Sequence, residues 1–183
     1  MTPKKVFFTK GVGKHKDELQ AFELALKNAG IEKCNLVYVS SILPPGCQII
    51  SKEEGITKLQ AGQITYCVMS RNCTDEPNRL IGASVGMAVP KDEGHHGYIS
   101  EYHSFGIPKE RVGDTAERLA ATMLARTLGL DVEVDKSKEW SDLKKEYIMS
   151  GYIVKTNSIT QTSEGDKDGT YTTVIAAAVF LEE

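Results

Sequence analysis

No apolar run in this 183-residue sequence is long enough to cross a bilayer, and its amino terminus lacks a hydrophobic signal region. Net charge is also small, since 22 basic and 25 acidic side chains leave a balance of -3. This balance gives no support for a nucleic-acid partner or an anionic membrane surface. We therefore expect a single cytoplasmic domain over residues 1–183, large enough to bury a substantial core.

Motifs for several common chemistries are missing. The four cysteines include no Cys-x-x-Cys pair, so zinc-ribbon or thioredoxin-like chemistry is not indicated and the cysteines are interpreted as structural. Gly11 and Gly13 follow the first expected strand without the third glycine or the lysine-hydroxyl pair of phosphate-binding loops, so we interpret them as a turn. No motif indicates the Schiff-base lysine and phosphate cup that pyridoxal phosphate requires.

A metal site built from His95, Glu101 and His103 is not expected either. Residues 96–103 are typical of a strand, on which Glu101 and His103 share a face because side chains alternate. His95 would lie about 20 Å from Glu101 at ~3.3 Å per residue, which is too far for one coordination sphere. We predict no metal.

The chain is organised around the segment Asn-Leu-Val-Tyr-Val-Ser-Ser-Ile-Leu-Pro-Pro-Gly at residues 35–46. Its first half is rich in β-branched and aromatic side chains and predicts a strand. The strand ends at the pair Ser40-Ser41, and the prolines at 44 and 45 fix the path that follows because proline lacks the amide hydrogen needed to extend a sheet. By pattern alone, this remains an ordinary passage from a strand to a loop.

The rest of the chain predicts more strands than helices. Apolar spacing predicts helices over residues 16–29 and 108–128, ended by Gly30 and Gly129. The first has Leu19, Phe22, Leu26 and Ala29 on its buried face, with Glu23 at the edge of that face. Residues 48–60 are interpreted as a polar connector, and 136–145 as a charged loop or short helix anchored by Trp140. Strands are expected at 3–9, 63–70, 80–89, 96–103, 147–161 and 169–181, the last two forming a hairpin.

The segment at 35–46 resembles the self-processing segment of the pyruvoyl-dependent arginine decarboxylases. Further segments resemble the same family in matching order over nearly the whole chain: the helix at 21–31, Ala-Val-Pro-Lys-Asp at 88–92, Glu101-Tyr102 and the alanine-rich final strand. The resemblance implies that the chain cuts itself between Ser40 and Ser41 into residues 1–40 and 41–183. Ser41 then becomes an amino-terminal pyruvoyl group, which serves as the covalent cofactor.

Roles for other residues also follow from the resemblance. Asn35 matches an asparagine that helps to position the reacting groups, and Glu101 matches the glutamate that returns a proton to the α-carbon. Glu23 stands where the family has an aspartate that pairs with the guanidinium of arginine. The extra methylene is a departure that leaves the preference for arginine open. His103 is a second departure, at a position where family members carry glutamate.

The resemblance implies an α+β fold: a four-layer αββα sandwich with two mostly antiparallel sheets covered by helices, assembled as a homotrimer with active sites between subunits. The reaction it implies is decarboxylation of L-arginine to agmatine and carbon dioxide, feeding polyamine synthesis. Three alternatives stay open at this point. They are a pyruvoyl decarboxylase for another amino acid, an unprocessed trimeric binding protein of the same fold, and, more distantly, a hydrolase with a processed amino-terminal serine.

Overall fold

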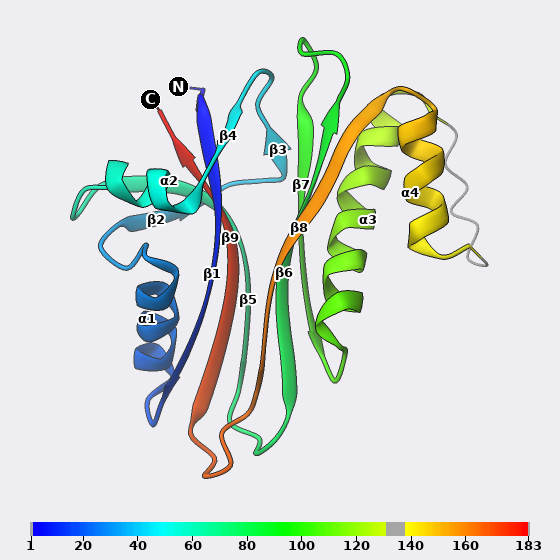
Figure 1. The fold of residues 1–183 in the computed structure, drawn as a ribbon. Coiled ribbons are helices and arrows are strands. Elements are labelled where there is room, and N and C mark those ends of the chain that lie inside the picture. Colours follow the sequence, from blue (N-terminus) through cyan, green and yellow to red (C-terminus); the bar gives the residue numbers. More distant parts are fainter. Residues whose placement is uncertain (1, 131–137, 183) are drawn as a thin grey trace.

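Two β-sheets stack face to face in this chain, and helices cover the outer face of each (Figure 1). The computed structural model describes residues 2–130 and 138–182. Its elements run in the order β1 (Lys5–His15), α1 (Glu18–Ala29), β2 (Asn35–Tyr38), β3 (Ile42–Leu43), β4 (Gln48–Ile50), α2 (Lys52–Lys58), β5 (Ile64–Thr74), β6 (Leu80–Pro90), β7 (Gly97–Phe105), α3 (Lys109–Thr127), α4 (Trp140–Met149), β8 (Ile153–Glu164) and β9 (Tyr171–Leu181).

The first sheet has the strand order β2-β5-β9-β1-β4, and the second has the order β3-β7-β6-β8. All pairs are antiparallel except β1 with β4 and β2 with β5. The predicted four-layer αββα sandwich is therefore confirmed. The predicted hairpin of the last two strands is wrong, because β8 pairs with β6 in the second sheet while β9 pairs with β1 and β5 in the first.

Three apolar layers hold the sandwich together, as expected when each sheet face needs cover. The outer face of the first sheet packs on α1 through side chains that include Ala25, Ala29 and Met69. Between the sheets lie residues such as Val68, Ile99 and Ala178. The outer face of the second sheet is covered by α3, against which α4 packs in turn (Figure 1).

Gly11 and Gly13 do not form the predicted turn. Strand β1 continues through both of them to His15. A Cβ atom at Gly11 would lie 2.1 Å from the carbonyl oxygen of Ala25, and one at Gly13 would lie 2.2 Å from that of Ala21. The two glycines therefore let the backbone of α1 rest directly on β1, a close-approach role that glycine in a strand often serves.

The first helix is confirmed, but its buried face differs from the predicted one. Asp17 caps its amino end by accepting a hydrogen bond from the Gln20 amide, and Gly30 ends it in the left-handed conformation. The buried residues are Ala21, Ala25 and Ala29, whereas Leu19 is exposed. Small side chains occupy the contact because the glycines of β1 bring the two backbones so close together.

Other expectations need smaller corrections. The connector expected at 48–60 contains strand β4 and helix α2. The strand expected from residue 147 begins at Ile153, since 147–149 close α4. The helix expected at 108–128 is confirmed as α3. Of the charged segment expected at 136–145, residues 136 and 137 lie outside the described residues, and Trp140 begins α4 and packs beside Tyr147.

Replacing Gly86 with alanine should destabilise the protein strongly. Its Cβ would lie 2.3 Å from the backbone carbonyl of Ala116 in α3, so the helix would have to move away from the sheet. We expect the free energy of unfolding to fall by about 3 kcal/mol. The matched control is Gly82→Ala on the same strand, whose Cβ would meet the Val112 side chain at 3.1 Å. A side chain can move aside more easily than a helix backbone, so Gly82→Ala should lower the free energy of unfolding by only about 1 kcal/mol. Denaturant titration of both variants measures the two losses. Equal losses of stability would contradict this explanation.

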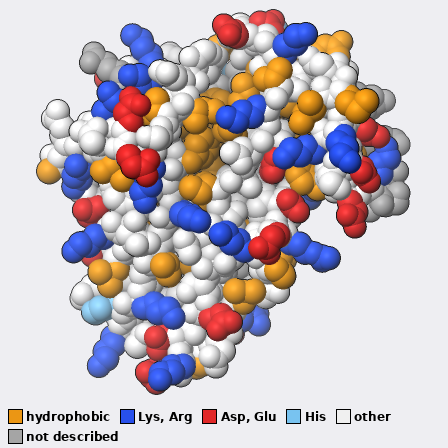
Figure 2. All heavy atoms as spheres, viewed as in Figure 1, with side chains coloured by type: hydrophobic (Ala, Val, Ile, Leu, Met, Phe, Trp, Pro, Cys, Tyr) orange, Lys and Arg blue, Asp and Glu red, His pale blue; other side chains and the backbone are white. Residues whose placement is uncertain are grey.

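One edge of the sandwich is open. Figure 2 shows hydrophobic side chains in a hollow at the upper centre of the view. A cavity of about 170 Å³ lies between strands β1 and β4 of the first sheet and strands β6 and β8 of the second, and Phe8, Ile49, Met87 and Ile159 are among the residues that line it.

Within residues 2–130 and 138–182, no helix is both long and apolar enough to span a membrane.

Candidate active site

The serine pair lies where the chain passes from one sheet to the other. Strand β2 belongs to the first sheet and β3 to the second, and residues 39–41, here called the crossover segment, join them. On the first sheet the Val39 amide donates to the Cys67 carbonyl at 3.0 Å. On the second sheet the Ser41 carbonyl accepts a hydrogen bond from the Ile99 amide at 2.7 Å. The Ser40-Ser41 peptide bond thus lies between two backbone hydrogen bonds, one to each sheet.

The prolines after β3 fix its exit path as the sequence predicted. The Cys47 amide donates to the Pro44 carbonyl at 3.1 Å, and Gly46 has a φ of 67°. Proline at the second position and a glycine with positive φ at the third are the signature of a type II turn. This rigid turn leads from β3 into β4, which pairs with β1 in the first sheet.

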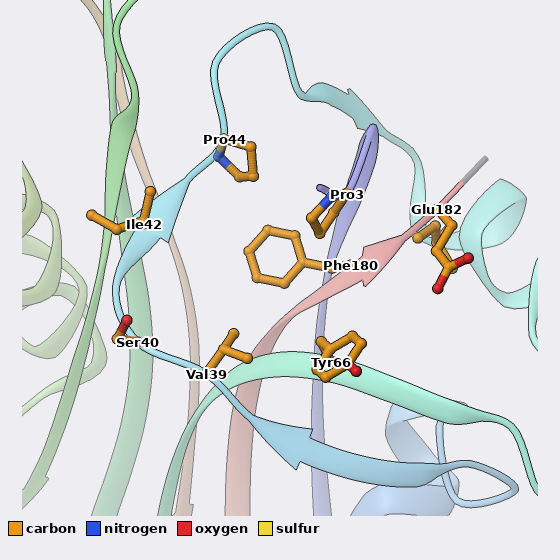
Figure 3. A pocket seen from close by; sticks show the side chains of 9 residues that line it. Pro3, Val39, Ser40, Ile42, Pro44, Tyr66, Phe180 and Glu182 are labelled. Carbon is orange, nitrogen blue, oxygen red and sulfur yellow. The ribbon is translucent and has the colours of Figure 1, made fainter. Parts of the chain in front are cut away.

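A cavity of about 460 Å³ opens beside Ser40. In Figure 3, Ser40, Val39 and Ile42 lie on one side of it, while Phe180, Tyr66 and Pro3 lie across from them. Its walls are mainly apolar, and Glu182 contributes a carboxylate at the far side (Figure 3). The cavity gives the serine segment an apolar flank formed by both chain ends and the crossover segment.

Glu101 lies on the strand that holds Ser41. Strands β3 and β7 pair antiparallel with Ile42 opposite Tyr98, so the ladder continued by one residue places Ser41 opposite Ile99. Glu101 follows two residues later on the same face of β7, about 7 Å along the strand. The structure therefore brings the predicted proton donor to the crossover segment, next to the predicted cleavage site.

Hydrogen bonds from the first sheet fix the part of β7 that carries Glu101. The Ser70 hydroxyl donates to the Tyr102 carbonyl at 2.8 Å, and the Asn72 side-chain amide donates to the Ser104 carbonyl at 2.8 Å. Both donors lie on β5, so these bonds bridge the two sheets across the interior. They hold the backbone beside Glu101 and His103 at a fixed position relative to the first sheet.

The protein surroundings shift the pKa values of Glu101 and of two residues that interact with it, Cys67 and Tyr38. Partial burial raises the pKa of Glu101, while the nearby His103 acts in the opposite direction. Burial, helped by the Glu101 charge, raises the pKa of the Cys67 thiol to about 12. Burial likewise raises the pKa of Tyr38. Cys67 and Tyr38 are therefore neutral at physiological pH, and the Glu101 carboxyl holds its proton to a higher pH than an ordinary glutamate.

Asn35 and Glu23 are not brought to the serine pair within one chain. Asn35 begins β2, at the end of the strand farthest from Ser41, and its side-chain amide donates to the Gly62 carbonyl there at 2.8 Å. Glu23 is exposed on α1, which packs on the outer face of the first sheet. Ser41 lies at the inner face, beside the layer that contains Leu43 and Ile99.

Sequence patterns missed the backbone groups that hold the serines. The Ile99 amide fixes Ser41, and the Ile42 amide donates to the Ser40 carbonyl at 3.0 Å. Every residue except proline carries such an amide, so no residue type marks one that acts at a site. The Ile99 bond follows from the way β3 pairs with β7, and the Ile42 bond follows from the turn at Ser41.

Comparisons with known proteins agree on one family. The sequence pattern of the family described as Pyruvoyl-dependent arginine decarboxylase matches residues 5–183. A protein of Chlorobaculum tepidum named "Probable pyruvoyl-dependent arginine decarboxylase" is 58% identical over 179 residues, covering 98% of this chain and 97% of that protein. One of Chloroherpeton thalassium with the same name is 56% identical with the same coverage. "Pyruvoyl-dependent arginine decarboxylase 2" of Methanosarcina mazei is 52% identical over 181 residues, covering 99% of this chain and 98% of that protein.

Proposed function

Because the chain belongs to the family of pyruvoyl-dependent arginine decarboxylases, we propose that it cleaves itself between Ser40 and Ser41 and then converts L-arginine to agmatine and carbon dioxide. The observation that carries this assignment is the serine pair held on the crossover segment between the two sheets. Agmatine formed in this way would enter polyamine synthesis. The two products of cleavage are residues 1–40 and 41–183.

The residues around Ser41 fit a pyruvoyl group. Such a group supplies an electron sink for the charge that decarboxylation leaves on the α-carbon. The Ile99 amide holds the Ser41 carbonyl oxygen, which would remain next to the new ketone, and its 2.7 Å hydrogen bond favours negative charge there. Ser41 is partly buried, and the cavity beside Ser40 is lined mainly by apolar side chains.

Cleavage would not separate the two products. Residues 1–40 contain β1, which lies inside the first sheet between β9 and β4 and pairs with β9 along its whole length. The same fragment contributes α1, whose alanines are buried against that sheet. The cleaved protein therefore keeps the same fold, with a break only at the crossover segment.

Glu101 is proposed as the acid that returns a proton to the α-carbon of the substrate. The role needs a carboxyl group that is protonated near neutral pH, and partial burial moves the pKa of Glu101 in that direction. Its place two residues from Ile99 puts it beside the crossover segment. A general acid positioned in this way typically contributes ~10² to 10⁴ to a rate.

We propose that the chain works as a homotrimer whose sites lie between subunits. Asn35 and Glu23 lie away from the serine pair of their own chain, so they would act on the serine pair of a neighbour. Large apolar side chains are also exposed along the edge formed by β2, β3 and the start of β5: Val37, Tyr38, Ile42 and Ile64. A solution mass of one chain at assay concentrations would contradict the trimer.

Substrate preference tests the role of Glu23. A carboxylate is the matching partner for a guanidinium, and the longer glutamate changes the depth at which it is held. Glu23→Asp should change the ratio of kcat/KM for arginine to those for lysine and ornithine, by up to about tenfold for a shift of ~1.4 kcal/mol. Steady-state assays with the three amino acids measure this ratio. Unchanged ratios would exclude position 23 from substrate recognition.

The whole assignment can be tested on freshly purified protein. An intact-mass spectrum should show two fragments that meet between residues 40 and 41, the larger carrying a ketone in place of an amine. The same preparation should release agmatine from arginine. A single chain that stays whole on long incubation, with no agmatine formed, would contradict the assignment.

A further inference from the structure

The peptide bond between Ser40 and Ser41 lies inside a tight turn of the chain. The Ile42 amide donates to the Ser40 carbonyl at 3.0 Å, which closes a three-residue turn with Ser41 at its centre. Among the described residues, Asn78 is the one non-glycine residue with a positive φ, so the turn at Ser41 is of the inverse type. The carbonyl that the Ser41 hydroxyl must attack is therefore already hydrogen-bonded within its own segment.

Neighbouring contacts hold this turn on both sides. Before it, the Val39 amide is bound to Cys67 of the first sheet. After it, Ile42 and Leu43 pair with Tyr98 and Gly97 of β7 in the second sheet. The Ile42 amide is thus kept in place by the β3–β7 pairing while it points back to the Ser40 oxygen rather than across the ladder.

We propose that the Ile42 amide is the oxyanion donor of the self-cleavage reaction. The proposal rests on the proposed function, and it adds a group that no side-chain motif reveals. A backbone amide fixed at 3.0 Å from the reacting oxygen lies in the range of donors that stabilise negative charge in acyl transfer. The amide gains strength as the oxygen becomes charged, because a hydrogen bond to an ionised acceptor is stronger than one to a neutral carbonyl.

Self-cleavage begins when the Ser41 Oγ forms a bond to the carbonyl carbon of Ser40, and the carbonyl π electrons move to the Ser40 oxygen, which faces the Ile42 amide. When the carbonyl re-forms, the carbon–nitrogen bond breaks and the hydroxyl proton ends on the Ser41 nitrogen. An ester now joins Ser40 to Ser41 Oγ. Loss of the Ser41 α-proton then expels the Ser40 carboxylate, and water converts the remaining dehydroalanine to the pyruvoyl group and ammonia.

The sharpest test replaces the Ile42 amide alone. A precursor made with the α-hydroxy analogue of isoleucine at position 42 keeps the side chain and exchanges the N–H for an oxygen. The first-order rate of appearance of fragment 1–40, followed by intact mass, should fall about 100-fold. Ile42→Ala changes the side chain and keeps the amide, so its rate measures the side-chain contribution, and the α-hydroxy analogue should be slower than this variant as well as the parent. Ile42→Pro removes the same amide by ordinary mutagenesis and should slow cleavage at least as much.

The outcomes separate the inference from the proposed function. A parent chain that never yields fragment 1–40 contradicts the proposed function. A parent that cleaves, with an ester analogue that cleaves equally fast, overturns only the role of the Ile42 amide. A readout without any change at position 42 covers the case in which these variants fold poorly. In the uncleaved Ser41→Ala precursor the Ile42 amide hydrogen should be protected from exchange with solvent, and exchange at the rate of an unstructured amide would also overturn the inference.

Discussion

The Ser41→Ala chain should remain a single polypeptide of 183 residues and should release no agmatine from arginine. The substitution removes the hydroxyl that we propose attacks the Ser40 carbonyl and whose loss leads to the pyruvoyl group. Activity should fall by about 10⁶-fold or more, towards the rate of the uncatalysed reaction, because the variant cannot form the pyruvoyl electron sink. Intact mass and an agmatine assay on one preparation measure both effects.

Ser40→Ala is the matched control for this prediction. Ser40 provides the attacked carbonyl through its backbone, and its exposed side chain makes none of the hydrogen bonds that the structure describes around the crossover segment. Cleavage and agmatine release should therefore continue. If the Ser40 variant stayed whole while the Ser41 variant was cut, the two serines would have exchanged roles and the site of the cofactor would be wrong.

Melting temperature distinguishes a chemical effect of Ser41→Ala from loss of folding. The hydrogen bonds at Ser41 are made by its backbone: its carbonyl accepts from Ile99, and the turn around it is closed by Ile42. Alanine keeps these groups and removes one oxygen at a partly buried position. We expect a melting temperature close to that of the parent, so that lost cleavage reports on the hydroxyl.

Local sequence patterns predicted much of the fold because each pattern corresponds to a local physical cause. The helix at 18–29 has a capping aspartate and a glycine at its end, and the strand before the serines is marked by β-branched residues. Contacts between distant segments are not encoded in this way. Gly11 and Gly13 have the pattern of a turn, and only the approach of α1 explains why β1 continues through them.

The candidate site was predicted to a similar extent. The pairing of β3 with β7 brings Ser41 and Glu101 to the same part of the second sheet, and the roles that the resemblance implies for them remain predictions. Asn35 and Glu23 stay apart from them within one chain, since Asn35 lies at the end of β2 farthest from the serines and α1 covers the outer face of the first sheet. No pattern in a single sequence states which surface meets a second copy, so their roles remain predictions that depend on assembly.

Glu101→Gln should leave self-cleavage intact while turnover falls by about 10² to 10⁴. Glutamine keeps the size of the side chain and can still form hydrogen bonds, but its amide is not acidic enough to protonate the α-carbon. In the parent, partial burial raises the pKa of Glu101, so the protonated and active form persists above the pH at which an ordinary glutamate ionises. Turnover should therefore decline as the pH rises through that raised pKa, and the glutamine variant should lack this decline.

His103 offers a control that moves the pH profile without removing the acid. Its positive charge lowers the pKa of Glu101, against the stronger effect of burial. His103→Gln removes that charge, so the descending limb of the profile should move to higher pH, with kcat at low pH retained. Profiles of kcat against pH for the parent and both variants provide the test. A limb that stays in the Glu101→Gln variant, or that moves to lower pH in His103→Gln, would mean that another group donates the proton.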